Sequence, residues 1–340
     1  MTVRLAALAA LAVAGCSGDS GAPTLPSPSA PALLAVEAPN VGIQLVTPAG
    51  RPVALVRLPS SLHGGNTPAW SPDGRTLAFT ADTDAPTAGP LLPPTDVYTA
   101  SAAGGRLRRV TTGRNALYPA WSPDGRWIAY TAMSLVDGRR AGAIWLVRPD
   151  GTDTRPLTAA HADVFDLAGP FDPASGRIAF TRCVRAVTLR NGMVPDTCSV
   201  WTMTADGGDA RRLATESEQP SWSPDGRRIV FASARDHATR IRTGEDEQSW
   251  IRQIYVMNAD GSGQRRLAVS KTDDQRPDWA PGGAVIAYET RRADTRRTTV
   301  SLADADGSCR GTLAPPRAQR DDGYHAPAWR PGGIAAPLVC

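Results

Sequence analysis

The amino-acid sequence predicts an all-β fold, a six-bladed β-propeller with four antiparallel strands in each blade. Three observations carry this prediction. An aromatic turn motif repeats along the chain, a second hairpin motif lies between its copies, and the chain enters and leaves the repeat in complementary phase. The 32 glycines and 30 prolines among 340 residues also suit a fold that is dense in turns.

The first motif is Trp-Ser-Pro-Asp-Gly. Intact copies lie at residues 70–74, 121–125 and 222–226, and degenerate copies lie at 171–176, 279–283 and 329–333. The lead aromatic therefore recurs at intervals of 51, 50, 51, 57 and 50 residues, and a fixed period of this size indicates a repeat architecture. Proline, aspartate and glycine are the residues of a tight turn, and an apolar β-rich run follows each intact copy. We interpret the motif as a hairpin corner that serves folding and not chemistry.

The second motif is a strand that leads to an Asp-Gly or Gly-Gly turn and then to a return strand. Its copies lie at residues 96–105, 143–151, 199–207, 253–261 and 299–307. Two hairpins in each period give four antiparallel strands, which is one propeller blade.

The phase of the repeat predicts how the ring closes. The folded part opens with a second-type hairpin at residues 41–56 and ends with a first-type hairpin at residues 327–339. The N-terminal outer strands are expected to complete the blade that the C-terminal inner strands begin, which removes free sheet edges. The propeller is then expected to occupy residues 40–340.

These motifs resemble the β-propeller of TolB-type proteins. The resemblance rests on Trp-Ser-Pro-Asp-Gly followed by Ile-Ala-Tyr (residues 128–130), alternating with Ile-Tyr-Val-Met-Asn-Ala-Asp-Gly-Ser (residues 254–262), over about 300 residues. It implies the propeller fold and a binding role. The sequence departs from TolB in having a tether where TolB has an α/β domain, so the resemblance does not imply a place in a Tol–Pal complex.

The N-terminal region predicts export. Residues 1–15 carry Arg4 and then an apolar run that is too short to span a bilayer, as in a secretory signal peptide. Val-Ala-Gly-Cys at residues 13–16 resembles a bacterial lipobox, which implies that Cys16 is lipidated and anchors the protein to the cell membrane or the outer membrane. The alternative is an ordinary cleaved signal peptide. Residues 16–39 are rich in proline, serine and alanine and predict a disordered tether.

Four further cysteines suit an oxidising compartment. Cys183 and Cys198 flank one connection between adjacent antiparallel strands, so we expect them to form a disulfide bond. Cys309 and Cys340 remain by elimination, and the sequence leaves open whether they pair or stay free.

Several function classes are disfavoured. The net charge of +4 and the scattered arginines argue against nucleic acid as a partner. No Gly-x-Ser-x-Gly elbow is present, which excludes a hydrolase of the prolyl-oligopeptidase type. We expect no cofactor, no catalytic residue and a monomeric propeller.

The face that carries the longer connections is the candidate binding face. The Asp-Gly turns share the opposite face, whereas connections that feed the inner strands should ring the mouth of the central channel. The candidate ligand-binding residues are His63, Asn66, Asn115, Tyr118, Asp163, Asp166, Glu218, Asp274, Gln275 and His325. The alternative is that these connections are polar only because they are solvated.

We therefore predict a binding or scaffold module that recognises a protein, peptide or other envelope ligand over the channel mouth. The alternative function is a metal-dependent lyase or hydrolase, because some relatives in this family that degrade uronate oligosaccharides hold a metal with histidines at this mouth. His63, His161 and His325 lack the tight spacing of a metal site, so we expect no metal.

Overall fold

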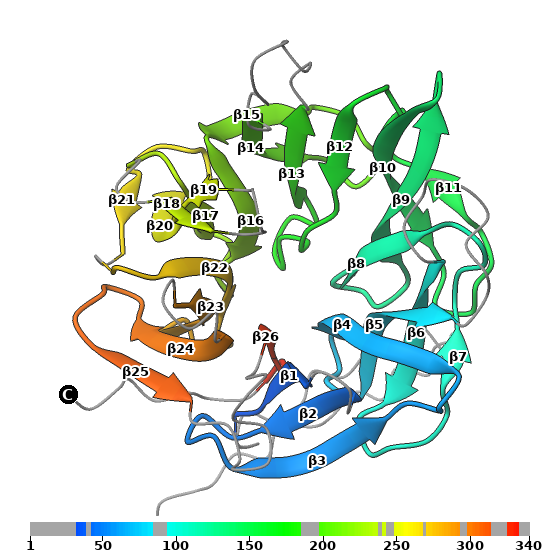
Figure 1. Cartoon of the computed structure of the whole chain (residues 1–340), viewed down its shortest axis with the longest axis horizontal. Coiled ribbons are helices and arrows are strands. Elements are labelled where there is room, and N and C mark those ends of the chain that lie inside the picture. Colours follow the sequence, from blue (N-terminus) through cyan, green and yellow to red (C-terminus); the bar gives the residue numbers. More distant parts are fainter. Residues whose placement is uncertain are drawn as a thin grey trace, which may run out of the picture.

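The strands form a ring around a central axis (Figure 1). This computed structural model describes residues 32–38, 42–83, 94–184, 197–236, 240–242, 248–267, 270–292, 298–313 and 325–332. These residues form strands and turns but no helix. The described part of the chain therefore contains no helix that could cross a membrane. The predicted all-β propeller is confirmed.

Four sheets of the ring have four strands each. The first contains β4 (Leu62–Trp70), β5 (Thr76–Thr83), β6 (Thr95–Ser101) and β7 (Arg108–Arg109). The second contains β16 (Ser217–Trp222), β17 (Arg228–Ser233), β20 (Gln253–Asn258) and β21 (Arg265–Arg266). The third contains β22 (Asp273–Trp279), β23 (Val285–Arg291), β24 (Thr298–Asp304) and β25 (Arg310–Leu313). The fourth contains β26 (His325–Trp329), β1 (Leu34–Ala38), β2 (Gly42–Val46) and β3 (Pro52–Arg57).

A further sheet has eight strands. Its first half contains β8 (Ala116–Trp121), β9 (Ile128–Val136), β10 (Arg139–Val147) and β11 (Arg155–Pro156). Its second half contains β12 (Val164–Leu167), β13 (Ile178–Val184), β14 (Thr197–Met203) and β15 (Arg211–Thr215). The strands within each half are antiparallel. The two halves are joined between β10 and β12 by one parallel pair, Gly142 with Phe165. The strands thus divide into four four-stranded sheets and one of eight, not into six separate sheets. A short ribbon of β18 (Arg240–Arg242) and β19 (Gln248–Trp250) lies in the connection between β17 and β20.

The first and last strands that the structure describes share one sheet. Strand β26 pairs with β1 in the register Leu34 with Trp329, and β1 pairs with β2. The prediction of a tether up to residue 39 is wrong here, because Leu34, Ala35 and Val36 are strand residues with no solvent exposure. A strand buried on both faces has a continuous apolar run without alternation, so this Ala-rich segment does not carry the usual mark of a strand. Residues 333–340, which include the expected strand at 334–339, lie outside the described residues.

The Trp-Ser-Pro-Asp-Gly turns have the hydrogen bonds that their sequence predicts. In the first copy Ser71 Oγ donates to Asp73 Oδ1 at 2.6 Å and accepts from the backbone N–H of Thr76 at 2.9 Å. Gly74 ends the turn at φ 63°, where a residue with a Cβ would be strained. The same serine–aspartate bond joins Ser122 to Asp124 and Ser223 to Asp225, each at 2.6 Å. The motif is therefore a structural corner of the sheet.

The core consists of apolar clusters between neighbouring sheets. The second strand of successive repeats contributes one aromatic ring at the same position. These rings, all buried, belong to Phe79, Tyr130, Phe180, Phe231 and Tyr288. Each packs with residues of an adjacent strand or sheet, as Phe180 does with Trp201 at a ring-centroid distance of 6.3 Å.

We predict that Phe180→Ala lowers the free energy of unfolding by about 3–5 kcal/mol, because it removes a fully buried ring and leaves a cavity. Urea denaturation followed by circular dichroism measures this change. Leu107→Ala is the control, since Leu107 is 36 % exposed and should change stability by only about 0.5 kcal/mol. A loss below about 1 kcal/mol for Phe180→Ala would contradict this account of the core.

Candidate functional site

The centre of the ring contains a cavity of about 350 Å³. Strands β4, β8, β12, β16, β22 and β26 face it, either directly or through the residues that follow them. Five of these inner segments carry a Pro-x-Trp sequence, and the other carries Pro-Phe. All their prolines line the cavity: Pro68, Pro119, Pro170, Pro220, Pro277 and Pro327.

The residue before each proline forms a second feature of the cavity wall, which we call the pre-proline ring. Its members are Thr67, Tyr118, Gly169, Gln219, Arg276 and Ala326. All except Gly169 have a positive φ, between 42° and 56°. A positive φ is unfavourable for a residue with a side chain, most of all for a β-branched one such as Thr67. Strained backbone of this kind is concentrated at functional sites.

β-Bulges accompany the pre-proline ring. The register of the inner strand shifts between Asn66 and Ala69 in β4, and between Leu117 and Ala120 in β8. Equivalent shifts occur in β16 and β22. A bulge bends its strand and redirects the side chain. The repeated bulges therefore give the cavity wall its shape.

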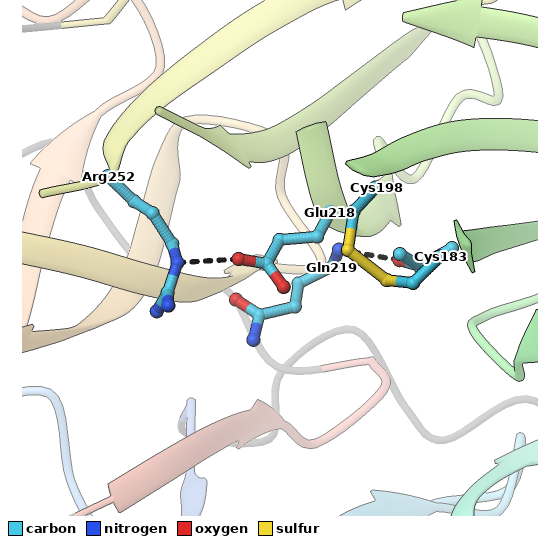
Figure 2. The surroundings of a disulfide bond; sticks show 6 residues. Cys183, Cys198, Glu218, Gln219 and Arg252 are labelled. Carbon is cyan, nitrogen blue, oxygen red and sulfur yellow. Dashed lines mark hydrogen bonds and ion pairs between the residues drawn. A yellow bond between two sulfur atoms is a disulfide. The ribbon is translucent and has the colours of Figure 1, made fainter. Parts of the chain in front are cut away.

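A network of charges lies on one side of the cavity, at β16 and β22. The Arg252 guanidinium contacts Glu218 Oε1 at 2.5 Å (Figure 2). It also donates to Gln275 Oε1 at 2.7 Å. Its backbone N–H donates to Asp273 Oδ1 at 2.8 Å. Burial acts to lower the pKa of Arg252, but the charges of Glu218 and Asp273 outweigh it and hold that pKa above its usual value. Arg252 is thereby fixed as a cation behind the cavity wall.

Arg276 belongs to the pre-proline ring and continues this network. Its Nη1 donates to Glu289 Oε2 at 2.7 Å, and its backbone N–H donates to Gln219 Oε1 at 2.9 Å. The Arg276 side chain is one-third exposed, whereas that of Glu289 is buried. Arg276 is the cation that the cavity wall presents, and Glu289 is its buried counter-ion.

Asp278 connects three inner strands at the cavity. Its Oδ1 accepts from Ser221 Oγ of β16 at 2.9 Å, and its Oδ2 accepts from the backbone N–H of Trp329 in β26 at 2.8 Å. Burial raises the pKa of Asp278 to about 6, although these hydrogen bonds favour the charged form. The Asp278 side chain thus links β16, β22 and β26, and its ionisation lowers the stability of the folded protein.

We predict that Asp278→Asn stabilises the protein at pH 8 and not at pH 4. A folded-state pKa above the unfolded value means that Asp278 costs stability as the pH rises from about 4 to about 6, and that the full cost persists above this window. Asparagine can keep both contacts without the charge, because its Oδ1 can accept from the backbone N–H of Trp329 while its NH2 group donates to Ser221 Oγ. The gain at pH 8 should be on the order of 1–3 kcal/mol, measured by urea denaturation at both pH values. An equal effect at both values would exclude ionisation as the cause.

The disulfide bond between Cys183 and Cys198 is confirmed, with an S–S distance of 2.05 Å. It joins directly opposite residues of β13 and β14, beside the cavity wall (Figure 2). Thr181, two residues earlier in β13, accepts through Oγ1 from the backbone N–H of Gln219 at 2.8 Å. The bonded hairpin therefore supports one member of the pre-proline ring. Cys309 is buried, and Cys340 lies outside the described residues.

The structure brings only part of the predicted binding set to the cavity. Tyr118 and Glu218 line it, and Gln275 supports it through Arg252. The lining residues that sequence reasoning does not find include Gln219, Arg276 and Asp278. Gln219 and Arg276 each precede the proline of a repeated Pro-x-Trp sequence, and this pattern could have identified them.

The remaining predicted residues are placed elsewhere. The backbone carbonyls of Asn66 and Asn115 accept hydrogen bonds from Thr80 and Met133, and neither asparagine lines the cavity. Asp163 pairs with Arg139. Asp166 is fully buried and accepts two bonds from Arg182, at 2.6 and 2.7 Å, which is a structural role.

Asp274 lies at a separate cavity, and the side chains of His63 and His325 are not among those described. His161 is exposed. Within the part of the chain that the structure describes, no group of three histidine, cysteine, aspartate or glutamate side chains is placed to hold a metal ion.

Comparison with known proteins shows what the chain is similar to. It matches no family model. It is 30 % identical over 249 residues to a protein TolB homolog of Chlorobium luteolum, a match that covers 63 % of this chain and 51 % of the relative. It is 30 % identical over 192 residues to the uncharacterized peptidase YuxL of Bacillus subtilis, covering 56 % of this chain and 24 % of that protein.

The structure of a putative TolB from Agrobacterium tumefaciens has the same fold. The two superpose with a TM-score of 0.58 at 22 % identity, over 89 % of this chain and 99 % of that one. The chain thus has a TolB-like β-propeller. It spans about half the length of the TolB homolog and about a quarter of the peptidase, so the activities and partners of those whole proteins do not transfer to it directly.

Proposed function

We propose that this protein is an extracytoplasmic binding module whose central cavity receives a segment of another protein of the cell envelope. The observation that carries the proposal is the cavity itself, where the inner strands supply six prolines and the strained pre-proline ring. The similarity to TolB proteins supports an envelope role with protein partners in general.

An extended peptide segment suits the chemistry of the cavity wall. Much of the wall is proline, alanine and tryptophan, and its charged groups belong to Glu218, Arg276 and Asp278. Ligand sites are typically apolar with a few placed polar groups that fix orientation. At about 350 Å³ the cavity has room for a few side chains, not for a folded domain.

Two features support a location outside the cytoplasm. The Cys183–Cys198 disulfide bond is typical of an oxidising compartment. Residues 1–16 resemble a lipoprotein signal, and Cys16 would then hold the propeller to a membrane through a tether that ends before β1. Residues 1–31 lie outside the described residues.

We also infer that the ring counts six blades. Each half of the eight-stranded sheet has the four-stranded antiparallel order of the other sheets, and a single parallel residue pair joins the halves. The period of the sequence supports the same count. Among the described residues, no group of three histidine, cysteine, aspartate or glutamate side chains favours the alternative of a metal-dependent lyase or hydrolase.

The lipid anchor has a direct test. Intact-mass and peptide mass spectrometry of the mature protein should find Cys16 as the first residue, carrying acyl chains. An unmodified first residue other than Cys16 would disprove this part of the proposal without affecting the cavity.

Filling the cavity should abolish partner binding. Ala69 lines the cavity and is half-buried, so Ala69→Leu adds volume at the wall with little change in charge. The full-length wild type and variant are each purified from cross-linked membranes, and the proteins that co-purify are quantified by mass spectrometry. The partner recovered with the wild type should be at least ~10-fold less abundant with Ala69→Leu. The matched control is Ala174→Leu, the same change at an exposed position of a turn away from the cavity. Equal partner recovery with both variants would reject the cavity as the binding site.

A further inference from the structure

A second, smaller cavity of about 170 Å³ lies on the sheet β22–β25 and shares no lining residue with the central cavity. It is lined by Thr272, Asp274, Tyr288, Thr290, Ser301, Arg310, Gly311 and Thr312. All four strands of the sheet, or residues directly beside them, contribute to it. Asp274, expected at the channel mouth, is found here instead.

The lining of this cavity is rich in hydroxyl groups. Five of its eight residues carry a hydroxyl, and none is aliphatic. The floor is formed by Asp274, Tyr288 and Ser301, all buried, whereas Arg310 and Thr312 are exposed at its opening. Such a surface offers little to an apolar ligand. It offers many donors and acceptors to a polar one.

The polar groups are held in place before any ligand binds. Asp274 Oδ2 accepts from Ser270 Oγ at 2.7 Å, and Oδ1 accepts from Thr272 Oγ1 at 2.8 Å. Thr290 Oγ1 lies 2.8 Å from Ser301 Oγ. A carboxylate has about four lone-pair sites, so Asp274 keeps acceptor capacity after these bonds. Fixed groups lose little conformational entropy on binding.

The charges of the cavity balance. Asp274 supplies one negative charge and Arg310 one positive charge, and no other lining residue is ionised at neutral pH. Burial raises the pKa of Asp274 to about 6, and the nearby charge of Arg310 opposes that rise. A ligand with a net charge therefore gains little Coulomb energy, so a neutral polar ligand is favoured.

We propose that this cavity binds a neutral monosaccharide unit, whose hydroxyl groups donate to the Asp274 carboxylate and accept from the Arg310 guanidinium. The volume corresponds to about half a dozen waters at about 30 Å³ each. A ligand that displaces them must replace their hydrogen bonds, and a polyhydroxylated ring carries enough donors and acceptors to do so. The proposal does not depend on the occupant of the central cavity.

Saturation-transfer NMR on the mature chain tests it, with D-glucose, D-galactose and N-acetyl-D-glucosamine as separate probes at about 10 mM, since a site of this size suits millimolar affinity. We expect saturation transfer to at least one sugar. Asp274→Asn should weaken binding by about 10- to 100-fold, the effect of losing a charged hydrogen-bond acceptor. Arg310→Gln, a change at the exposed opening, should weaken it without affecting the fold.

Two control variants separate this cavity from sugar binding elsewhere on the protein. Asp260→Asn makes the same change in an exposed turn and should leave the signal unchanged. Ala69→Leu, in the central cavity, should also leave it unchanged, so failure of the proposed function and failure of this inference are distinguishable. Absence of transfer from all three sugars, or undiminished transfer with both Asp274→Asn and Arg310→Gln, would overturn the proposal. Tighter binding of D-glucuronate than of D-glucose would overturn the assignment of a neutral ligand.

Discussion

The pairing of β26 with β1 is the contact on which the rest of the architecture depends. It joins Leu34 to Trp329 and so converts a row of sheets into a closed ring. Trp70 reinforces the closure, because its indole N–H donates to the carbonyl of Ala328 at 3.1 Å across the joint between β4 and β26. Only a closed ring holds the inner strands around one axis, and the central cavity exists because they are held there.

The cavity also shows how a repeat can produce an asymmetric site. Proline recurs at equivalent positions and gives the wall its regular form, but the residue before it varies from alanine and threonine to glutamine and arginine. Arg276 and Gln219 lie on adjacent inner strands, Glu218 lines the cavity beside them, and Arg252 and Glu289 support this sector from behind the wall. The charged lining residues Glu218, Arg276 and Asp278 therefore occupy one sector of the wall, which would give a bound segment a defined orientation.

Much of the fold could be predicted from the sequence, because turn chemistry and period are local properties. Ser71, Asp73 and Gly74 make the turn that their types dictate, and the Cys183–Cys198 pair follows from the hairpin that it closes. The site is less predictable. Asp166 and Asp274 are polar residues of inner strands, as the hypothesis of a channel-mouth site requires, but Asp166 pairs with Arg182 of the neighbouring strand and Asp274 lies at a separate cavity. Which group each carboxylate meets depends on how the strands pair and not on a local motif. Strand β1 escapes prediction because burial on both faces removes the alternation that marks a strand.

The sheet shared by the first and last described strands has a consequence for synthesis and export. Strands β1 to β3 emerge first, but β26, the neighbour that completes their sheet, emerges last. Contacts so far apart in sequence form slowly, because a very long loop must close before they contribute. Until then β1 presents an open, apolar edge to other chains, which is the condition that favours aggregation. A chain crossing a membrane from its N-terminus would therefore need its leading strands protected until the final strand arrives.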